Sequence, residues 1–236
     1  MQAERPYAVV NVIKGPQKLP QNEILVLPDG EHMGGLGDGL DGLDQLAVEK
    51  ARGALAEGRT QRVWVTYQGQ KIQLFIEIAN PSPTLVMVGG VHTAITLTAI
   101  AKDLGYQTIV IDPRRAFGSQ ERFPHVDQLI SCWSDEAFSQ FTISRDTAIA
   151  MFTHDPKIDD PALKIALASP AFYIGALGSP KTQEKRRQRL LADGFTPDQL
   201  ARIHGPIGLE IGADTPEEIA LAVMAEIVKT YHQRGS

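Results

Sequence analysis

The fold of this chain is decided by the stretch LVMVGGVHTAITLTAIAKDLGYQTIVID, residues 85–112. Residues 85–88 form an apolar run with the length of a buried strand, and a Gly-Gly pair then predicts a tight turn. Residues 93–104 carry apolar side chains at helical spacing, and residues 108–111 are a second buried strand. Strands that alternate with helices in this way predict an α/β fold built on a mainly parallel sheet.

The turn of this unit predicts a site for an anionic ligand. A helix N-terminus exposes unpaired N–H groups, and Gly89 and Gly90 would let a phosphate approach them. Asp112 follows about twenty residues later, where dinucleotide-binding units place the acid that binds the ribose. Val91 replaces the second glycine of that fingerprint, and a β-branched side chain there would project toward the pyrophosphate. His92 could donate to an anion or pack locally, and a βαβ unit with an empty crevice remains an alternative.

Composition bounds the class of protein. A chain of 236 residues with 43% hydrophobic content can bury a core as one large or two small domains. Its net charge of −5 disfavours nucleic acid and a polybasic membrane surface. Cys132 is the single cysteine, so an internal disulfide and a cysteine-cluster metal site are excluded. Because we find neither a membrane-spanning apolar run nor a signal-peptide pattern, we expect a cytoplasmic protein without membrane attachment.

The N-terminal part predicts a small α+β arrangement. Residues 7–13 and 23–27 are β-branched or apolar strands, and a glycine-rich segment from residue 34 leads into a helix. Residues 63–76 alternate around Gln68-Gly69, which is the signature of a β-hairpin. Two prolines in residues 80–83 then make a stiff connector, where we place the domain boundary.

We therefore predict a smaller N-terminal α+β domain, residues 1–80, and a C-terminal domain, residues 81–236, with a mainly parallel sheet. Three further strands are expected in the second domain, at residues 126–130, 146–152 and 171–177. The strand at 146–152 is apolar throughout, which indicates burial on both faces.

Polar residues follow two of the expected strands, where open parallel sheets bind ligands. Arg114 could clamp a phosphate or be a solvated surface charge. His154 and Asp155 invite a catalytic interpretation, but neighbours on a strand point to opposite faces and no nucleophile motif accompanies them. We expect no catalytic residue: His154 is a candidate ligand contact, and Asp155 is either a second contact or a helix cap.

A second helix start carries a stronger signal. Ser179 is a candidate N-cap with Pro180 at the first helical position, so Gly178 and Ser179 should present free N–H groups. Lys181 adds a positive charge. Anion binding and capping alone both explain this pattern.

Six motifs then carry a resemblance to a known family. They are LVMVGGVH (85–92), IDPRRAF (111–117), ERFP (121–124), THDPKID (153–159), YIGALGSPKTQ (173–183) and HGPIGLEIGADTPEEIALAVMAEIV (204–228). With them the chain resembles the XdhC/CoxI family, accessory proteins for xanthine-dehydrogenase-type molybdoenzymes. The resemblance implies a Rossmann-like domain that holds molybdenum cofactor, a pterin, and hands it to the apoenzyme after sulfuration by a cysteine desulfurase. It implies a chaperone rather than a catalyst.

The chain departs from that family in two motifs and in the N-terminal loop after Gly15. Its members usually carry G-A-G-H where this chain has Val91 in the third place, and a glycine-rich segment ending in cysteine where this chain has Leu40.

The hypothesis that follows is a cofactor site with two walls and with polar groups between them. The cofactor-binding candidates are Gly89, Gly90, His92, Asp112 and Arg114 in the first wall, Gly178, Ser179 and Lys181 in the second, and His154 and Asp155 between. We expect no protein-bound metal and leave a homodimer open. The alternative is an NAD(P)-dependent oxidoreductase, or a nucleotide-binding regulatory protein, that uses the same turn.

Overall fold

The computed structural model describes residues 5–15, 22–37, 40–114 and 116–234. The chain divides into two compact units, the first ending at Pro81 and the second beginning at Ser82. Each unit has its own sheet and its own apolar core. Within the described ranges, no helix is long and apolar enough to cross a membrane.

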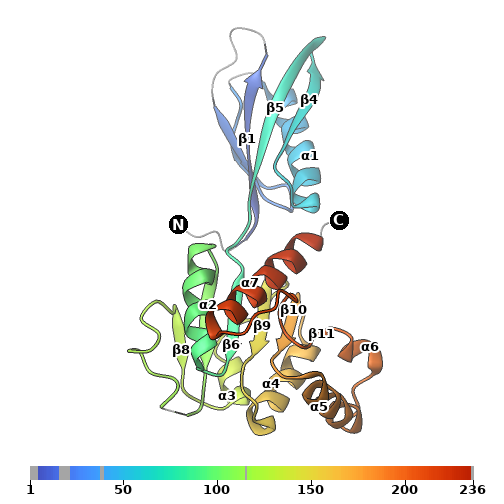
Figure 1. Ribbon diagram of the computed structural model, residues 1–236. Helices are drawn as coiled ribbons and strands as arrows, with labels where there is room; N and C mark the ends of the chain where they lie inside the picture. Colours follow the sequence, from blue (N-terminus) through green and yellow to red (C-terminus); the bar gives the residue numbers. More distant parts are fainter. Residues whose placement is uncertain (1–4, 16–21, 38–39, 115, 235–236) are drawn as a thin grey trace. The chain divides into compact units, whose positions relative to one another are not determined.

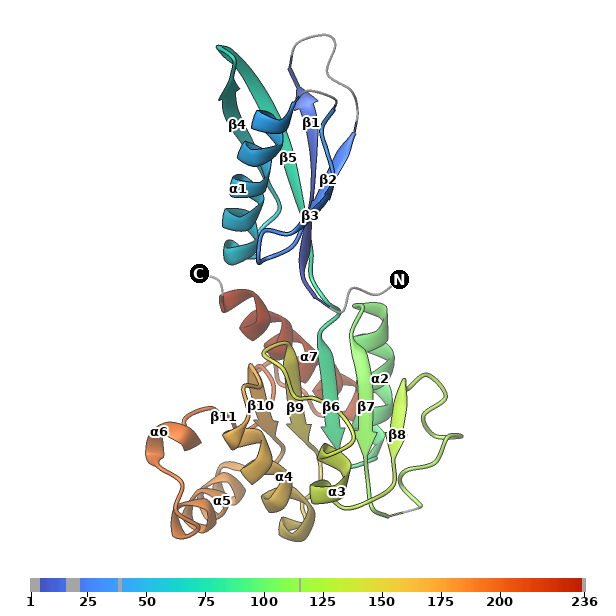
Figure 2. The same ribbon diagram turned by 180° about the vertical axis from the view of Figure 1, so that it is seen from behind.

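The first unit is a five-stranded antiparallel sheet in the order β3-β2-β1-β5-β4 (Figures 1 and 2). Its strands are β1 (Tyr7–Lys14), β2 (Glu23–Val26), β3 (His32–Gly34), β4 (Gln61–Tyr67) and β5 (Gln70–Ala79). Helix α1 (Asp41–Glu57) packs on one face, where alternate strand residues such as Val10 and Leu74 meet Leu43 and Ala47. The predicted hairpin is confirmed, since Tyr67 pairs with Gln70 across a two-residue turn.

The second unit contains a six-stranded parallel sheet in the order β11-β10-β9-β6-β7-β8. Its strands are β6 (Thr84–Val88), β7 (Gln107–Ile111), β8 (Gln128–Ile130), β9 (Thr147–Met151), β10 (Tyr173–Ala176) and β11 (Ile203–His204). From β6, the strands β7 and β8 extend the sheet in one direction. Strand β9 pairs with the other side of β6, and β10 and β11 extend the sheet in the opposite direction. The strand order therefore reverses between β6 and β9, and the predicted α/β class with a parallel sheet is confirmed.

Helices cover both faces of this sheet (Figure 2). They are α2 (His92–Asp103), α3 (Ser134–Phe138), α4 (Pro156–Ala168), α5 (Pro180–Ala192), α6 (Pro197–Leu200) and α7 (Pro216–Gln233). Helices α2 and α7 pack against one face, and α3, α4 and α5 pack against the other. The residues of β6 point alternately to these two faces. Leu85 and Met87 pack with α2 and α7, whereas Val86 and Val88 pack with α3, α4 and α5.

Several elements are shorter than the sequence indicates, and some were missed. The strands expected at 126–130 and 171–177 span only 128–130 and 173–176. The elements β3, α3, α6 and β11 were not predicted, because two to five residues do not complete a recognisable hydrophobic period.

The packing of α2 leads to a stability prediction. Leu97 on α2 is 0% exposed, so Leu97→Ala should lower the free energy of unfolding by about 2–5 kcal/mol. The matched control Leu221→Ala on α7, where the leucine is 54% exposed, should change it by less than about 0.5 kcal/mol. Urea unfolding followed by circular dichroism measures both values, and equal losses would contradict the core assignment.

Candidate functional site

The candidate site lies at the carboxyl edge of the parallel sheet, where the strand order reverses. Open parallel sheets bind ligands at this point because the loops after the two central strands diverge there. Gly89 follows β6 with φ +109°, and a Cβ atom added to it would lie 2.6 Å from Cγ2 of Thr153, which follows β9. The loops after β6 and β9 are therefore in direct contact, and only glycine fits at position 89.

The Asp112 carboxylate holds the β6 turn in place. Its side chain is 0% exposed, and its oxygens accept hydrogen bonds from the Gly90 amide at 2.8 Å and the Arg114 amide at 2.9 Å. The Arg114 guanidinium donates two more through Nε and Nη2, at 2.9 and 2.8 Å. Burial raises the pKa of Asp112, but these hydrogen bonds outweigh it, so the pKa lies below its ordinary value. Asp112 therefore positions Gly90 and Arg114 and does not face solvent.

The loop after β7 folds over the same turn. A Cβ atom on Gly90 would lie 2.4 Å from the carbonyl oxygen of Phe117, so that backbone rests directly on the glycine. The Arg114 and Arg122 guanidinium carbons lie 4.1 and 5.5 Å from the centre of the Phe117 ring. Arg122 was not among the residues predicted to bind a cofactor, although it belongs to the ERFP motif. Arg115, the neighbour of Arg114 in the IDPRRAF motif, lies outside the described residues. Two cationic side chains therefore gather beside the β6 turn.

Helix α2 begins at this turn without a side-chain cap. Val91 occupies the N-cap position in an extended conformation, and no side chain bonds to the first-turn N–H groups. The Val91 side chain packs against the apolar cluster shared by α2 and α7, instead of projecting toward a ligand. His92 is exposed, and its Nε2 lies 3.2 Å from Oε1 of Glu217. The first turn of α2 can therefore accept an anion.

Two other long helices that start at this edge, α4 and α5, are capped by side chains at their N-cap positions. Asp155 accepts a hydrogen bond from the Lys157 amide at 2.9 Å and caps α4. Ser179 accepts one from the Thr182 amide at 3.3 Å, which confirms the predicted N-cap of α5. Among these three helices, α2 is thus the one whose N-terminus has no side-chain cap.

The second predicted wall lies one strand farther along the edge. Gly178, with φ +134°, is closed by its own helix, since an added Cβ atom would meet Cγ2 of Thr182 at 2.8 Å. Lys181 is exposed and forms no ion pair within the described part of the chain. Strand β9 separates this turn from the β6 turn, and α5 packs on the face opposite to α2. Within the described residues, no hydrogen bond joins the two walls. The loop after β9, by contrast, contacts the first wall, where Thr153 lies against Gly89.

A buried polar network ties the β9 and β10 loops together. The Thr153 hydroxyl donates to Oδ1 of Asp159 at 2.5 Å, and Nη2 of Arg186 donates to Oδ2 at 3.2 Å. Nη1 of Arg186 donates to Oε1 of Gln183 at 2.5 Å, and Gln183 donates to the Gly178 carbonyl at 3.2 Å. Burial raises the pKa of Asp159 to about 6. The sequence did not predict this network; the spacing of Gln183 and Arg186, one helical turn apart, was its only signal. His154, by contrast, is exposed beside it.

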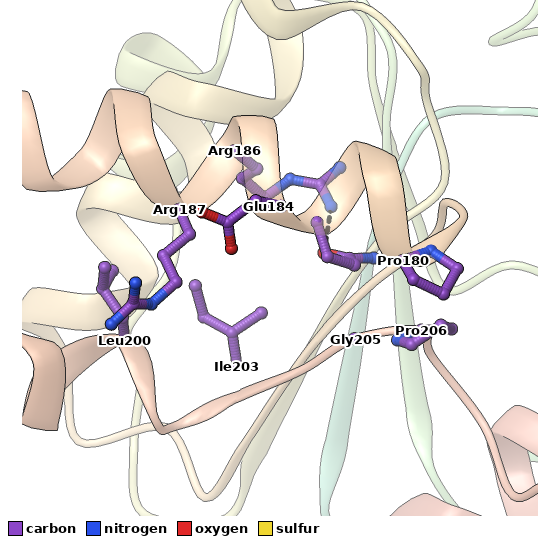
Figure 3. Close-up of a pocket in the computed structure, with 9 residues that line it drawn as sticks. Pro180, Glu184, Arg186, Arg187, Leu200, Ile203, Gly205 and Pro206 are labelled. Carbon is purple, nitrogen blue, oxygen red and sulfur yellow. Dashed lines mark hydrogen bonds between the residues drawn. The ribbon is translucent and has the colours of Figure 1, made fainter.

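A cavity of about 270 Å³ lies against the first turns of α5 (Figure 3). Its lining residues are Pro180, Gln183, Glu184, Arg186, Arg187, Leu200, Ile203, Gly205 and Pro206. It shares Gln183 and Arg186 with the buried network, so a change in the network would also change its wall. No group of three His, Cys, Asp or Glu side chains in the described ranges could hold a metal ion.

The Asp112 network leads to a pH prediction. Because the folded pKa is lowered, the stabilisation is fully present above the unfolded value near 3.8 and is lost as pH falls through the folded pKa. Asp112→Asn should lower the free energy of unfolding by about 2 kcal/mol at pH 7, and the difference from wild type should narrow below pH 3.8. Urea unfolding at pH 7 and pH 3 measures the difference; an equal gap at both would contradict the role of the charge.

Comparisons with known proteins agree with the geometry of this unit. Residues 85–227 match the family model described as the XdhC Rossmann domain. A protein from Bacillus subtilis (strain 168), named as a probable xanthine dehydrogenase subunit, is 34% identical over 161 residues, which cover 68% of this chain and 47% of that protein. "Molybdenum cofactor insertion chaperone PaoD" from Escherichia coli (strain K12) is 35% identical over 85 residues, covering 36% of this chain and 27% of that protein.

A third relative, "Uncharacterized protein YqeB" from Escherichia coli (strain K12), is 28% identical over 238 residues, with 95% of this chain and 43% of that protein covered. The chain therefore spans less than half the length of these relatives. A crystal structure described as a xanthine dehydrogenase from Bacillus halodurans has a TM-score of 0.60 at 19% identity, covering 98% of this chain and 93% of that one. That likeness supports the fold. Since the family match runs from β6 into α7 and includes the reversal of strand order, the chain belongs to the XdhC family through its Rossmann domain.

Proposed function

We propose that this protein is an accessory protein that binds molybdenum cofactor and delivers it to a xanthine-dehydrogenase-type molybdoenzyme. Two observations support the class of function. The chain belongs to the XdhC family, and one relative is named as a molybdenum cofactor insertion chaperone while another is named as a probable subunit of xanthine dehydrogenase. The relatives are longer than this chain, so the delivery step and its recipient are part of the proposal.

The observation that carries the proposal is the uncapped N-terminus of α2 where the strand order reverses. The cofactor is an anionic pterin that bears a phosphate, and this edge fits such a group. The first-turn N–H groups of α2 and the partly exposed Arg114 would bind the phosphate. Gly89 and Gly90 would keep the turn compact beside this phosphate, because side chains at these positions would collide with Thr153 and Phe117.

The remaining candidates divide into binding and positioning groups. His92, His154 and Lys181 are exposed at this edge and would contact the ligand directly. Asp112 would act through Gly90 and Arg114, whose positions it sets. The last candidates, Asp155, Gly178 and Ser179, form the starts of α4 and α5, so they would shape the crevice rather than contact its ligand strongly.

The chemistry of this protein would be binding and protection. When bound, the cofactor supplies the molybdenum centre and its sulfur; the chain would orient the pterin and exclude water from it. Charge-assisted hydrogen bonds of about 1.5–3 kcal/mol each would give a usable affinity while still allowing release to the apoenzyme. We further propose that a cysteine desulfurase supplies the sulfur to the bound cofactor. Leu40, which packs against the α1 cluster, has no thiol that could relay it.

An NAD(P)-dependent oxidoreductase is the second candidate function, and the position of Asp112 after β7 favours it. The same aspartate also argues against it, because its carboxylate is buried under four hydrogen bonds and does not reach out to a ribose. Titration of the purified protein with NADH, NADPH and molybdenum cofactor, followed by fluorescence, separates the two. Tight nicotinamide binding without a response to the pterin would overturn the proposed function.

The glycine turn gives a direct test by mutation. Gly90→Ala places a methyl group about where the Phe117 carbonyl lies, so it should displace the loop that covers the turn. Protein purified from a cofactor-replete host should then retain less than about a tenth of the wild-type molybdenum, a loss of more than about 1.4 kcal/mol in binding. Elemental analysis and pterin fluorescence measure the retention.

The matched control for this test is Gly53→Ala in α1, where an added Cβ atom meets nothing within 4 Å. It should leave molybdenum retention unchanged. Arg114→Gln, which shortens the side chain and removes its charge, should also reduce retention, because the guanidinium that would bind the phosphate is lost. Full retention in both Gly90→Ala and Arg114→Gln, with native circular dichroism spectra, would refute the site.

A further inference from the structure

The sheet of the first unit has an apolar face that α1 does not cover. Helix α1 packs on one face only, as Figures 1 and 2 show. The opposite face carries Val9, Leu25, Met33, Trp64 and Phe75, and we call it the open face. Met33 is 73% exposed and Trp64 is 55% exposed. Side chains of this size at both ends of one sheet face are typical of an interaction surface.

One cross-strand row of the open face has opposite charges at its two ends. Asn11 on β1 pairs with Glu23 on β2 and, on its other side, with Phe75 on β5; Phe75 in turn pairs with Arg62 on β4. The Arg62 guanidinium carbon lies 5.8 Å from the centre of the Phe75 ring. Because neighbouring strands lie about 4.8 Å apart, Glu23 and Arg62 are separated by roughly 14 Å and cannot pair within one chain.

The middle of this row contains an unsatisfied polar atom. Oδ1 of Asn11 is buried and accepts no hydrogen bond within the described part of the chain. A buried acceptor without a donor costs about 1–3 kcal/mol, so native structures rarely leave one on a central strand. An occupant of the open face that brings a donor to this point would remove the cost.

A second copy of the chain meets these requirements. Two copies can pack these sheets face to face about a two-fold axis that lies between them, parallel to β1 and level with Asn11. The second copy then presents the same row in reverse order. Its Glu23 then lies over Phe75, where the Arg62 guanidinium of the first copy is found. The two Asn11 side chains face each other, and packed sheets about 10 Å apart leave room for an amide-to-amide hydrogen bond after rotation of the side chains.

We propose that the open face is a dimer interface with a second copy of this chain, in which Glu23 of each copy pairs with Arg62 of the other. The charge row argues for this occupant, since its two ends complement each other when the row meets its own reverse. Apolar contact between the copies would supply the main stabilisation, and the two symmetric ion pairs would set the register.

A charge swap tests the pairing in the full-length chain. The single variants Arg62→Glu and Glu23→Arg each place like charges opposite one another, so each should raise the dimer dissociation constant about a hundredfold or more. The double variant Arg62→Glu/Glu23→Arg should restore the dimer, because the pair is rebuilt with reversed sign. Sedimentation velocity over a range of protein concentrations measures all four proteins. Arg52→Glu, an exposed position on α1, provides the matched control and should dimerise like wild type.

Three results would overturn the proposal. If wild-type protein sediments as a monomer at every concentration, the open face is not a dimer interface. If Trp64 is then also shielded from an added quencher, another part of the same chain covers the face. Single reversals that leave the dissociation constant unchanged place the dimer contact elsewhere. A double variant that stays monomeric with a native circular dichroism spectrum excludes the Glu23–Arg62 pair. Cofactor binding is not measured in this experiment, so its outcome is independent of the proposed function.

Discussion

The hydrogen bonds of the buried Asp112 carboxylate are the constraint on which the rest of the site depends. They fix the amide of Gly90 and the guanidinium of Arg114 with one side chain. Gly90 in turn supports the backbone at Phe117, whose ring lies close to the guanidinium groups of two arginines. A single buried charge thereby sets the turn before α2, the loop after β7 and the cationic groups between them. Removing a partner from such a buried network costs more than any one of its bonds contributes, because the remaining groups are left unsatisfied.

Local signals in the sequence predicted those features that are made by neighbouring residues. The Gln68-Gly69 hairpin follows from the backbone preferences of its turn, and the Ser179 cap follows from its position before Pro180. The parallel sheet was predicted from apolar runs separated by helical periods. Strand β11 was missed, since its two residues are held by pairing with β10 rather than by any preference of their own.

The candidate site was predicted less completely than the fold, because part of it depends on contacts between distant segments. Asp159 and Arg186 are 27 positions apart, and nothing in either segment shows that both side chains become buried together. Arginine on a helix is usually solvated, so sequence alone favours the surface. Asp112 was predicted as a ligand contact from its place after a strand, whereas its burial, which the structure shows, indicates a positioning role.

Val91 shows how the same residue changes its meaning once the fold is known. In the sequence it replaces a glycine and suggests an obstructed phosphate site. In the structure its side chain packs into the apolar cluster of α2 and α7, and the N-cap position consequently has no hydrogen-bonding group. A serine or aspartate there would satisfy the first turn internally and stabilise the helix by about 1 kcal/mol. Valine leaves those N–H groups without a side-chain partner, so an anion that bound there would also stabilise the helix.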